Sequence, residues 1–345
     1  MKKRGKFNIT YLRRFSQILF FILIVYGVFL LGQIADTFKI ESEAISDITE
    51  ANESISQTYR FVADYNLPVR SCSKAQDDNR FFQGCAMRLI SEKATMGSLV
   101  YFLPQLLLIL ALMLIFGRML CGWVCPLGFI SEIFSWIRRK LKINSLRLPR
   151  KTIDFMNKFK YYLLSFIIVA SIAVTLPIIG EGVVRKEFYQ LSCQFCPSKV
   201  IFGLLPGGWN LYLDFTSPLF IILTVISIIF FAMIVLSFFI DRFWCRLCPN
   251  GALISLFNKS ALFKKEKDLK KCTKCAICKR VCPIDNLTVY EEKEKEILNT
   301  EDCIMCMECV KYCPEDDCLK LKFLGKTLYS SKFEDKKKND NKKKK

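Results

Sequence analysis

The sequence predicts two parts: an α-helical domain that crosses a membrane four times, and a small α+β domain toward the C-terminal end. Two observations carry this prediction. The 345 residues are 52% hydrophobic and yet 24% charged, and membrane proteins reach that combination by separating apolar runs from charged segments. The 17 cysteines are too many for ordinary core residues, and most of them stand in short repeated motifs.

Four apolar stretches are each long enough to cross a hydrocarbon core of about 30 Å, which takes about 20 helical residues. They are residues 15–34, 96–116, 161–180 and 219–240. Basic residues precede the first stretch, as they do in a cleaved signal peptide. Its apolar run is longer than the usual signal, however, and no small-residue cleavage site follows it. We therefore interpret it as an uncleaved anchor.

The charges of the connecting segments predict the orientation. Residues 36–94 are rich in acids, whereas residues 138–151 are rich in lysine and arginine. Because basic loops stay on the cytoplasmic side, we expect a multi-pass protein of the cell inner (cytoplasmic) membrane with both termini in the cytoplasm. The same rule accounts for the net charge of +19, so the lipid bilayer is an expected partner and nucleic acid is not.

These patterns divide the chain into four segments. A basic tail (1–14) precedes the four-helix membrane domain (15–263), and a cysteine-rich domain (264–325) precedes a Lys-rich tail (326–345) that we expect to be disordered.

The cysteine-rich domain contains the pattern C-x2-C-x2-C-x3-C-P twice. In such tandem runs, three thiolates bind one [4Fe–4S] cluster and the fourth binds the other cluster. The spacing therefore predicts a bacterial-type 2[4Fe–4S] ferredoxin domain. The expected ligands are Cys272, Cys275, Cys278 and Cys313 for the first cluster, and Cys303, Cys306, Cys309 and Cys282 for the second.

Two other uses of these cysteines, structural zinc and disulfides, fit the pattern less well. Structural zinc also uses C-x2-C pairs, but it does not need two proline-terminated quartets in tandem, and the chain has no histidine. Disulfides are disfavoured in a reducing cytoplasm. Between the quartets, residues 287–298 predict a short hairpin around a charged turn. Cys318 is left over, and we expect it to be an unliganded residue at the domain edge.

A second repeat lies in the helical domain. The pattern R-x-x-C-x2/3-C-P-x-G begins at Arg118 after the second apolar stretch and at Arg242 after the fourth. Each copy precedes an amphipathic stretch (129–143 and 252–263) that suits an interfacial helix. Each of the two arginines can either anchor its helix end or face an anionic cluster. The unit is a helical hairpin used twice, so the membrane domain consists of two hairpin repeats.

Packing the two hairpins side by side would gather further cysteines at both membrane faces. At the inner face, proline stops the helix after each pair, and four thiols could form a further metal or cluster site or remain protonated and inert. At the outer face, disulfides and a cluster or redox-active pair are both open. The inner set is Cys121, Cys125, Cys245 and Cys248; the outer set is Cys72, Cys85, Cys193 and Cys196.

The paired motifs RMLCGWVCPLG and WCRLCPNGAL, followed by two ferredoxin quartets, resemble the NapH/NosR-type membrane polyferredoxin family. The resemblance implies four membrane spans, cytoplasmic C-terminal clusters and electron transfer between the quinone pool or cytoplasm and a periplasmic acceptor. The second motif here is C-x2-C-P rather than the family's usual C-x3-C-P. The outer cysteines are not part of the family pattern.

Together these features predict a membrane-bound iron–sulfur protein that carries electrons, an electron-transfer subunit rather than a stand-alone enzyme. Its expected cofactors are two [4Fe–4S] clusters, and its expected partners are redox proteins of a respiratory chain and quinone. Two alternatives are a transmembrane thiol/disulfide reductase and a metal-reducing assembly factor for a respiratory metalloenzyme.

Overall fold

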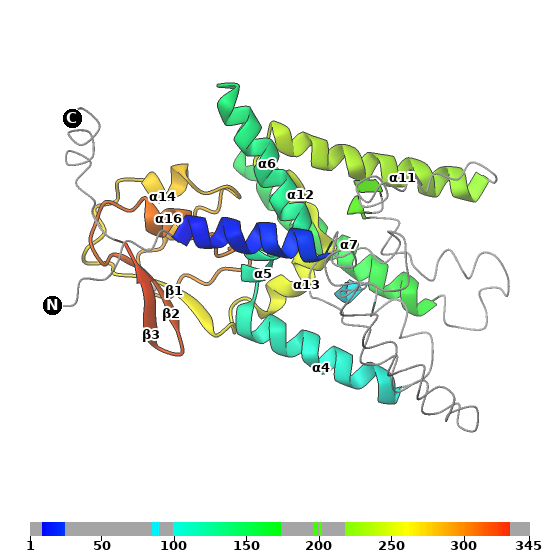
Figure 1. The fold of residues 1–345 in the computed structure, drawn as a ribbon, viewed down its shortest axis with the longest axis horizontal. Helices are drawn as coiled ribbons and strands as arrows, with labels where there is room; N and C mark the ends of the chain where they lie inside the picture. Colours follow the sequence, from blue (N-terminus) through cyan, green and yellow to red (C-terminus); the bar gives the residue numbers. More distant parts are fainter. Residues whose placement is uncertain are drawn as a thin grey trace.

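The computed structural model describes residues 9–24, 85–87, 89, 99–173, 196–198, 200–201, 218–294 and 296–331. The molecule has three regions along its long axis (Figure 1). Helices α4 and α11 extend to one side, the β-sheet and the cysteine loops lie at the other end, and the short helices α5, α12 and α13 lie between them.

The long helices coincide with the predicted apolar stretches only in part. Residues 9–24 are helical, and the other long helices are α4 (Leu99–Phe116), α7 (Arg150–Ala173) and α11 (Pro218–Val235). Helix α7 begins well before the predicted residue 161, because Pro149 starts the helix and no glycine or proline interrupts it. Within the part of the chain that the structure describes, no helix combines the length and apolar character needed to span a membrane.

Each cysteine–proline motif forms a short helix, a break and a second helix. In the first copy these are α5 (Met119–Trp123) and α6 (Pro126–Lys140); in the second they are α12 (Phe243–Leu247) and α13 (Pro249–Phe257), after the 3-10 turn η1 (Leu236–Phe238). The second cysteine of each pair is extended and caps the next helix, which begins with proline. The predicted amphipathic stretch 252–263 is wrong at its end, because α13 stops at Phe257 and the chain then enters the sheet.

The sheet is antiparallel with strand order β1-β2-β3. Its strands are β1 (Phe263–Lys267), β2 (Leu319–Phe323) and β3 (Lys326–Ser330). Leu324 and Gly325, both at positive φ, form the tight turn between the last two strands. The predicted disordered tail is therefore wrong for residues 326–330, which pair with β2; residues 332–345 lie outside the described residues.

The predicted hairpin at residues 287–298 is also wrong. Helix α15 (Thr288–Glu291) occupies its first half, where the Asn286 side chain accepts a hydrogen bond from the Thr288 N–H at 3.0 Å. In its second half, Ile297 pairs with Glu266 of β1. The segment thus pairs with a distant strand instead of with itself. Each cysteine loop ends in one helical turn, α14 (Ile277–Arg280) or α16 (Glu308–Lys311).

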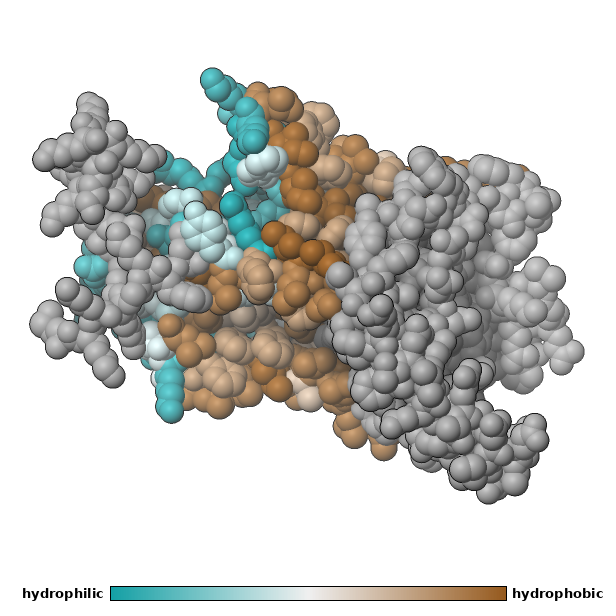
Figure 2. All heavy atoms as spheres, in the orientation of Figure 1, coloured by the Kyte–Doolittle hydropathy of each residue, from teal (hydrophilic) through white to brown (hydrophobic). Residues whose placement is uncertain are grey.

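One hydrophobic core joins the two predicted domains. Trp123 of α5 packs in the same cluster of buried residues as Met305, Val310 and Leu321 of the cysteine-rich domain. On the outer surface, a broad hydrophobic band covers the middle of the molecule, while hydrophilic residues gather at the end that carries the sheet (Figure 2).

Candidate iron–sulfur centres

The two quartets surround two separate cavities. The first cavity is lined by Cys272, Cys275, Cys278 and Cys313, together with Cys318. The second is lined by Cys282, Cys303, Cys306 and Cys309, with Cys278 at its border. The last cysteine of each run thus lies with the first three of the other, which is the grouping of the interleaved scheme. Cys318 is 2% exposed and lies against the first cavity, so its predicted place at the domain edge is wrong.

The middle cysteine of each loop is flanked by residues in the left-handed region of backbone space. These residues are Lys274 and Ala276 in the first loop and Met305 and Met307 in the second. Because each such residue costs about 1–2 kcal/mol without glycine, its appearance at four equivalent positions points to a functional requirement. Loops of this kind turn successive N–H groups to one side and favour an anion there.

Two buried lysines of β1 lie beneath the loops. Lys265 is 2% exposed and its Nζ lies 3.2 Å from Cys303 Sγ. Burial alone would lower the pKa of Lys265, but the negative charges of Cys303 and Cys309 raise it. Lys267 donates instead to the carbonyls of Val289 and Glu292, both at 2.9 Å. Lys265 is therefore a fixed cation beside the second cavity, and sequence reasoning missed it.

The buried thiols require a cationic partner before they can act as thiolates. Burial raises the pKa of Cys282 to about 12 and also raises that of Cys309, although Lys265 opposes the latter shift. A bound metal centre supplies the positive charge that makes thiolates stable in such surroundings. The all-sulfur donor sets in these cavities fit iron–sulfur clusters.

The inner cysteine pairs also come together. Cys125 interacts electrostatically with Cys121, Cys245 and Cys248, and burial raises its pKa. Burial likewise raises the pKa of Cys121 to about 11, with Arg118 opposing the shift. Across the described ranges, no three Cys, Asp or Glu side chains converge closely enough to hold a single metal ion.

The arginines of the repeat cross between the two motifs. Arg118 donates to the Cys245 carbonyl at 3.1 Å, and Arg242 donates to the Cys121 carbonyl at 3.3 Å. The glycine of each motif leaves room for the arginine of the other. A Cβ at Gly128 would lie 3.2 Å from Arg242 Nη1, and one at Gly251 would lie 3.3 Å from Arg118 Nη2. The repeated arginine and glycine therefore lock the two inner cysteine pairs to each other.

The second cysteine loop rests directly on the first inner motif. Trp123 Nε1 donates to the Met305 carbonyl at 3.0 Å. A Cβ at Gly122 would lie only 2.4 Å from the Ile304 carbonyl oxygen, so glycine permits this close approach. Neither Gly122 nor Trp123 was singled out from the sequence, because their partners are distant in the chain.

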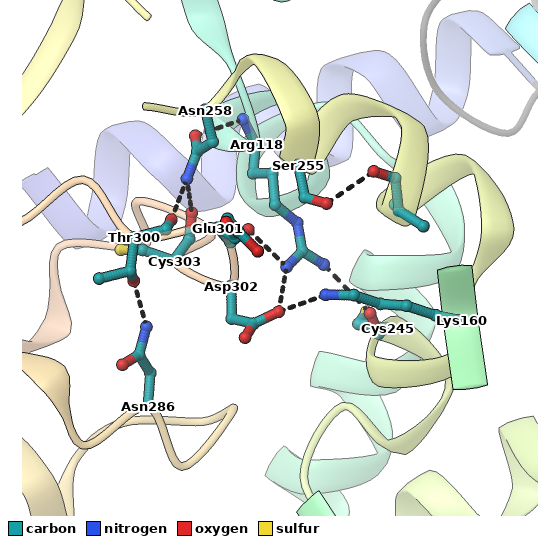
Figure 3. Close-up of polar contacts among 12 residues, drawn as sticks. Arg118, Lys160, Cys245, Ser255, Asn258, Asn286, Thr300, Glu301, Asp302 and Cys303 are labelled. Carbon is teal, nitrogen blue, oxygen red and sulfur yellow. Dashed lines mark hydrogen bonds and ion pairs between the residues drawn. The ribbon is translucent and has the colours of Figure 1, made fainter. Parts of the chain in front are cut away.

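Polar contacts of Arg118 from the first inner motif, and of Asn258 at the end of α13, fix the same interface (Figure 3). Arg118 reaches from the inner motif to the Glu301 carbonyl at 3.1 Å and to Asp302 Oδ1 at 3.3 Å. Asp302 also forms an ion pair with Lys160 of α7. Asn258 accepts from the Arg118 N–H at 2.9 Å and donates to the Cys303 carbonyl at 3.1 Å.

A second buried ion network joins the N-terminal helix to this interface. Arg13 donates to the Cys306 carbonyl at 3.0 Å and pairs with Glu132 and Glu308. Arg242 pairs with Glu132 at 2.9 Å. Burial alone would raise the pKa of Glu132, but the two guanidinium groups hold it at about 2. Arg13, predicted only as a flanking charge, thus connects three parts of the chain.

The predicted outer cysteine site lies only partly within the described residues. Cys85 and Cys196 are buried, and Cys85 packs with Leu163, Ile167 and Ala252. Cys72 and Cys193 lie outside the described residues, so this site stays a prediction.

Family models match both cysteine-rich regions. A 4Fe-4S binding domain matches residues 101–144 and 222–270, the two segments that contain the inner cysteine pairs. A 4Fe-4S dicluster domain matches residues 264–314, which contain both quartets. The chain therefore carries iron–sulfur binding domains.

Several curated proteins are similar to this chain. Uncharacterized protein MJ0750 of Methanocaldococcus jannaschii is 32% identical over 67% of this chain and 84% of its own length. The ferredoxin-type protein NapH of Escherichia coli is 29% identical over 58% and 60%, and the regulatory protein NosR of Pseudomonas aeruginosa is 24% identical over 60% and 26%. The chain thus spans about three fifths of NapH. No solved structure matches. With these relatives, domains and motifs, the chain belongs to the NapH/NosR-type polyferredoxin family.

Proposed function

We propose that this protein conducts electrons between two [4Fe–4S] clusters and a third centre at the inner cysteine pairs. The observation that carries the proposal is the contact between the second cysteine loop and the first inner motif, through Trp123 and Gly122. That contact leaves no solvent layer between the two sets of cysteines at this point. Ferredoxin-type relatives such as NapH support the electron-transfer role.

Each cluster would supply a one-electron redox centre, and the chain's residues would hold and tune it. The proposed ligands of the first are Cys272, Cys275, Cys278 and Cys313, and those of the second are Cys303, Cys306, Cys309 and Cys282. The grouping of these side chains around two cavities supports this assignment. Lys265 beside Cys303 would stabilise the more negative, reduced state of the second cluster.

The inner centre is proposed to be a further cluster held by Cys121, Cys125, Cys245 and Cys248. The match of both segments to one 4Fe-4S binding domain supports it. A zinc ion would draw four sulfurs to within about 4 Å of one another, since each Zn–S bond is about 2.3 Å. A cubane, with one thiolate on each iron, holds its four cysteine sulfurs farther apart, so the two kinds of centre differ in the sulfur spacing of the loaded protein.

We also propose that a lipid bilayer of the inner membrane covers the long helices, with both termini in the cytoplasm. Large apolar side chains on different helices support this, because Leu107 is 56%, Val169 61% and Ile222 57% exposed. Exposed apolar surface of this extent is costly in water. Respiratory redox partners and quinone remain predictions.

Anaerobic purification with iron, sulfide and EPR measurements tests the proposal. We expect about twelve irons per chain, falling to about eight when the four inner cysteines are changed to serine. The quadruple variant should keep both ferredoxin signals. Stoichiometric zinc in place of iron would reject the proposal. Eight irons per chain in the unchanged protein as well as in the quadruple variant would reject only the third cluster. The thiol-reductase alternative is not favoured, since Cys85 is buried among apolar side chains.

A further inference from the structure

A cavity of about 520 Å³ lies where three parts of the chain meet, and it shares the lining residue Cys282 with the second cysteine cavity. Its walls come from the N-terminal helix at Arg14, from α6 at Arg139, and from the cysteine-rich domain at Arg280, Cys282 and Tyr312. We call it the basic cavity. None of the electron-transfer roles assigned above requires a cavity at this point.

The basic cavity carries excess positive charge. Eight arginine or lysine side chains line it, against four carboxylates. All four carboxylates are already engaged in ion pairs with arginines. By contrast, Arg14, Arg139 and Arg280 form no ion pair with any residue that the structure describes. The buried Nε atoms of Arg13 and Arg138, which also line the cavity, have no hydrogen-bond partner among the described residues.

This lining has the chemistry of a phosphate site. A guanidinium group binds phosphate through two parallel N–H donors and keeps its charge at every physiological pH. The volume falls within the range of about 300–1,000 Å³ that is typical of small-molecule pockets, so it exceeds what an inorganic ion needs. We propose that the basic cavity binds an organic phosphate, either a soluble one or the headgroup of an anionic phospholipid.

Because of the position of the cavity, a bound phosphate would affect the reduction potential of the second cluster. Cys282, which lines it, is the proposed remote ligand of the second cluster. A phosphate bound here adds negative charge beside that cluster and makes its reduction less favourable. Occupancy of the basic cavity therefore lowers the reduction potential of the second cluster. This consequence rests on the proposed function, whereas the binding itself does not.

Calorimetric titration of the purified full chain with pyrophosphate tests the binding. We expect saturable binding that is at least tenfold weaker in the double variant Arg139→Gln/Arg280→Gln. Both side chains are exposed at the cavity, so the variant should fold. The matched control is Lys293→Gln/Lys326→Gln, which removes two exposed charges elsewhere and should bind like the unchanged protein. No saturable binding, or equal weakening in both double variants, would overturn the proposal.

Lipid nanodiscs distinguish the two sources of phosphate. Loss of pyrophosphate binding in phosphatidylglycerol discs, with binding kept in phosphatidylcholine discs, assigns the cavity to a lipid headgroup. Binding kept in both assigns it to a soluble phosphate.

An EPR-monitored redox titration of the cluster-loaded protein tests whether occupancy of the basic cavity lowers the reduction potential of the second cluster. Pyrophosphate should lower the potential of one ferredoxin cluster in the unchanged protein and not in Arg139→Gln/Arg280→Gln. Binding without any shift would overturn the coupling and leave the electron-transfer role standing.

Discussion

Replacing Lys265 by methionine should lower the reduction potential of one cluster and spare the other. Lys265 is buried, and its Nζ lies 3.2 Å from Cys303 Sγ, so its charge is close to the second proposed cluster. With the cluster bound, an added electron would be shared over its atoms, and we take about 7 Å as the mean separation between that charge and the ammonium. With an effective dielectric constant of about 20, the interaction is worth about 2 kcal/mol. That energy corresponds to about 100 mV in a one-electron potential.

The assay is an EPR-monitored redox titration of the anaerobic protein. Lys265→Met should shift one midpoint potential by about 100 mV to more negative values, while Lys265→Arg, which keeps the charge, should shift it much less. Lys264→Met is the matched control, because Lys264 is the adjacent residue of β1 and is not buried. Unchanged potentials in Lys265→Met with both clusters present, or equal shifts of both clusters, would refute the reasoning.

The cysteine motifs predicted an iron–sulfur protein, and the family models confirm that class. The spacing within each run accounts for three cysteines at each cavity, whereas the fourth comes from the other run and its place follows from the tandem pattern. The meeting of the two inner motifs, which lie far apart in the chain, was inferred from the repeat and not from spacing. The crossed contacts of Arg118 and Arg242 were only partly foreseen. The repeat indicated that both arginines matter, but their acceptors are the carbonyls of the opposite motif. Such a pairing depends on how the two motifs pack, which the sequence does not encode locally.

Long-range pairing explains the errors in the fold. Residues 287–298 have the pattern of a hairpin, but Ile297 finds its partner in β1. Lysine-rich β1 itself has no alternation of apolar residues, so Lys265 gave no signal as a buried group. Residues 326–330 were assigned to the tail because lysines follow them, whereas Tyr329 pairs with Leu321 of β2. In each case a tertiary contact outweighed local composition.

Three further changes test individual contacts. Cys275→Ser should remove the EPR signal of one ferredoxin cluster, and retention of both signals would contradict its assignment as a ligand. Gly122→Val should lower the free energy of unfolding by about 1–3 kcal/mol, because the valine side chain would meet the Ile304 carbonyl. Chemical denaturation measures this change, and an unchanged denaturation midpoint would rule out the close contact. Glu132→Gln tests the ion network. The folded pKa of Glu132 is about 2, against an ordinary 4.5, so its ionised form stabilises the protein by about 3 kcal/mol above pH 4.5. This contribution disappears as the pH falls from 4.5 toward 2, since the carboxylate is then protonated in both states. Denaturation curves at pH 7, 4.5 and 3 should therefore show a steeper loss of stability in the unchanged protein than in Glu132→Gln, and parallel losses would show that Arg13 and Arg242 do not stabilise the carboxylate.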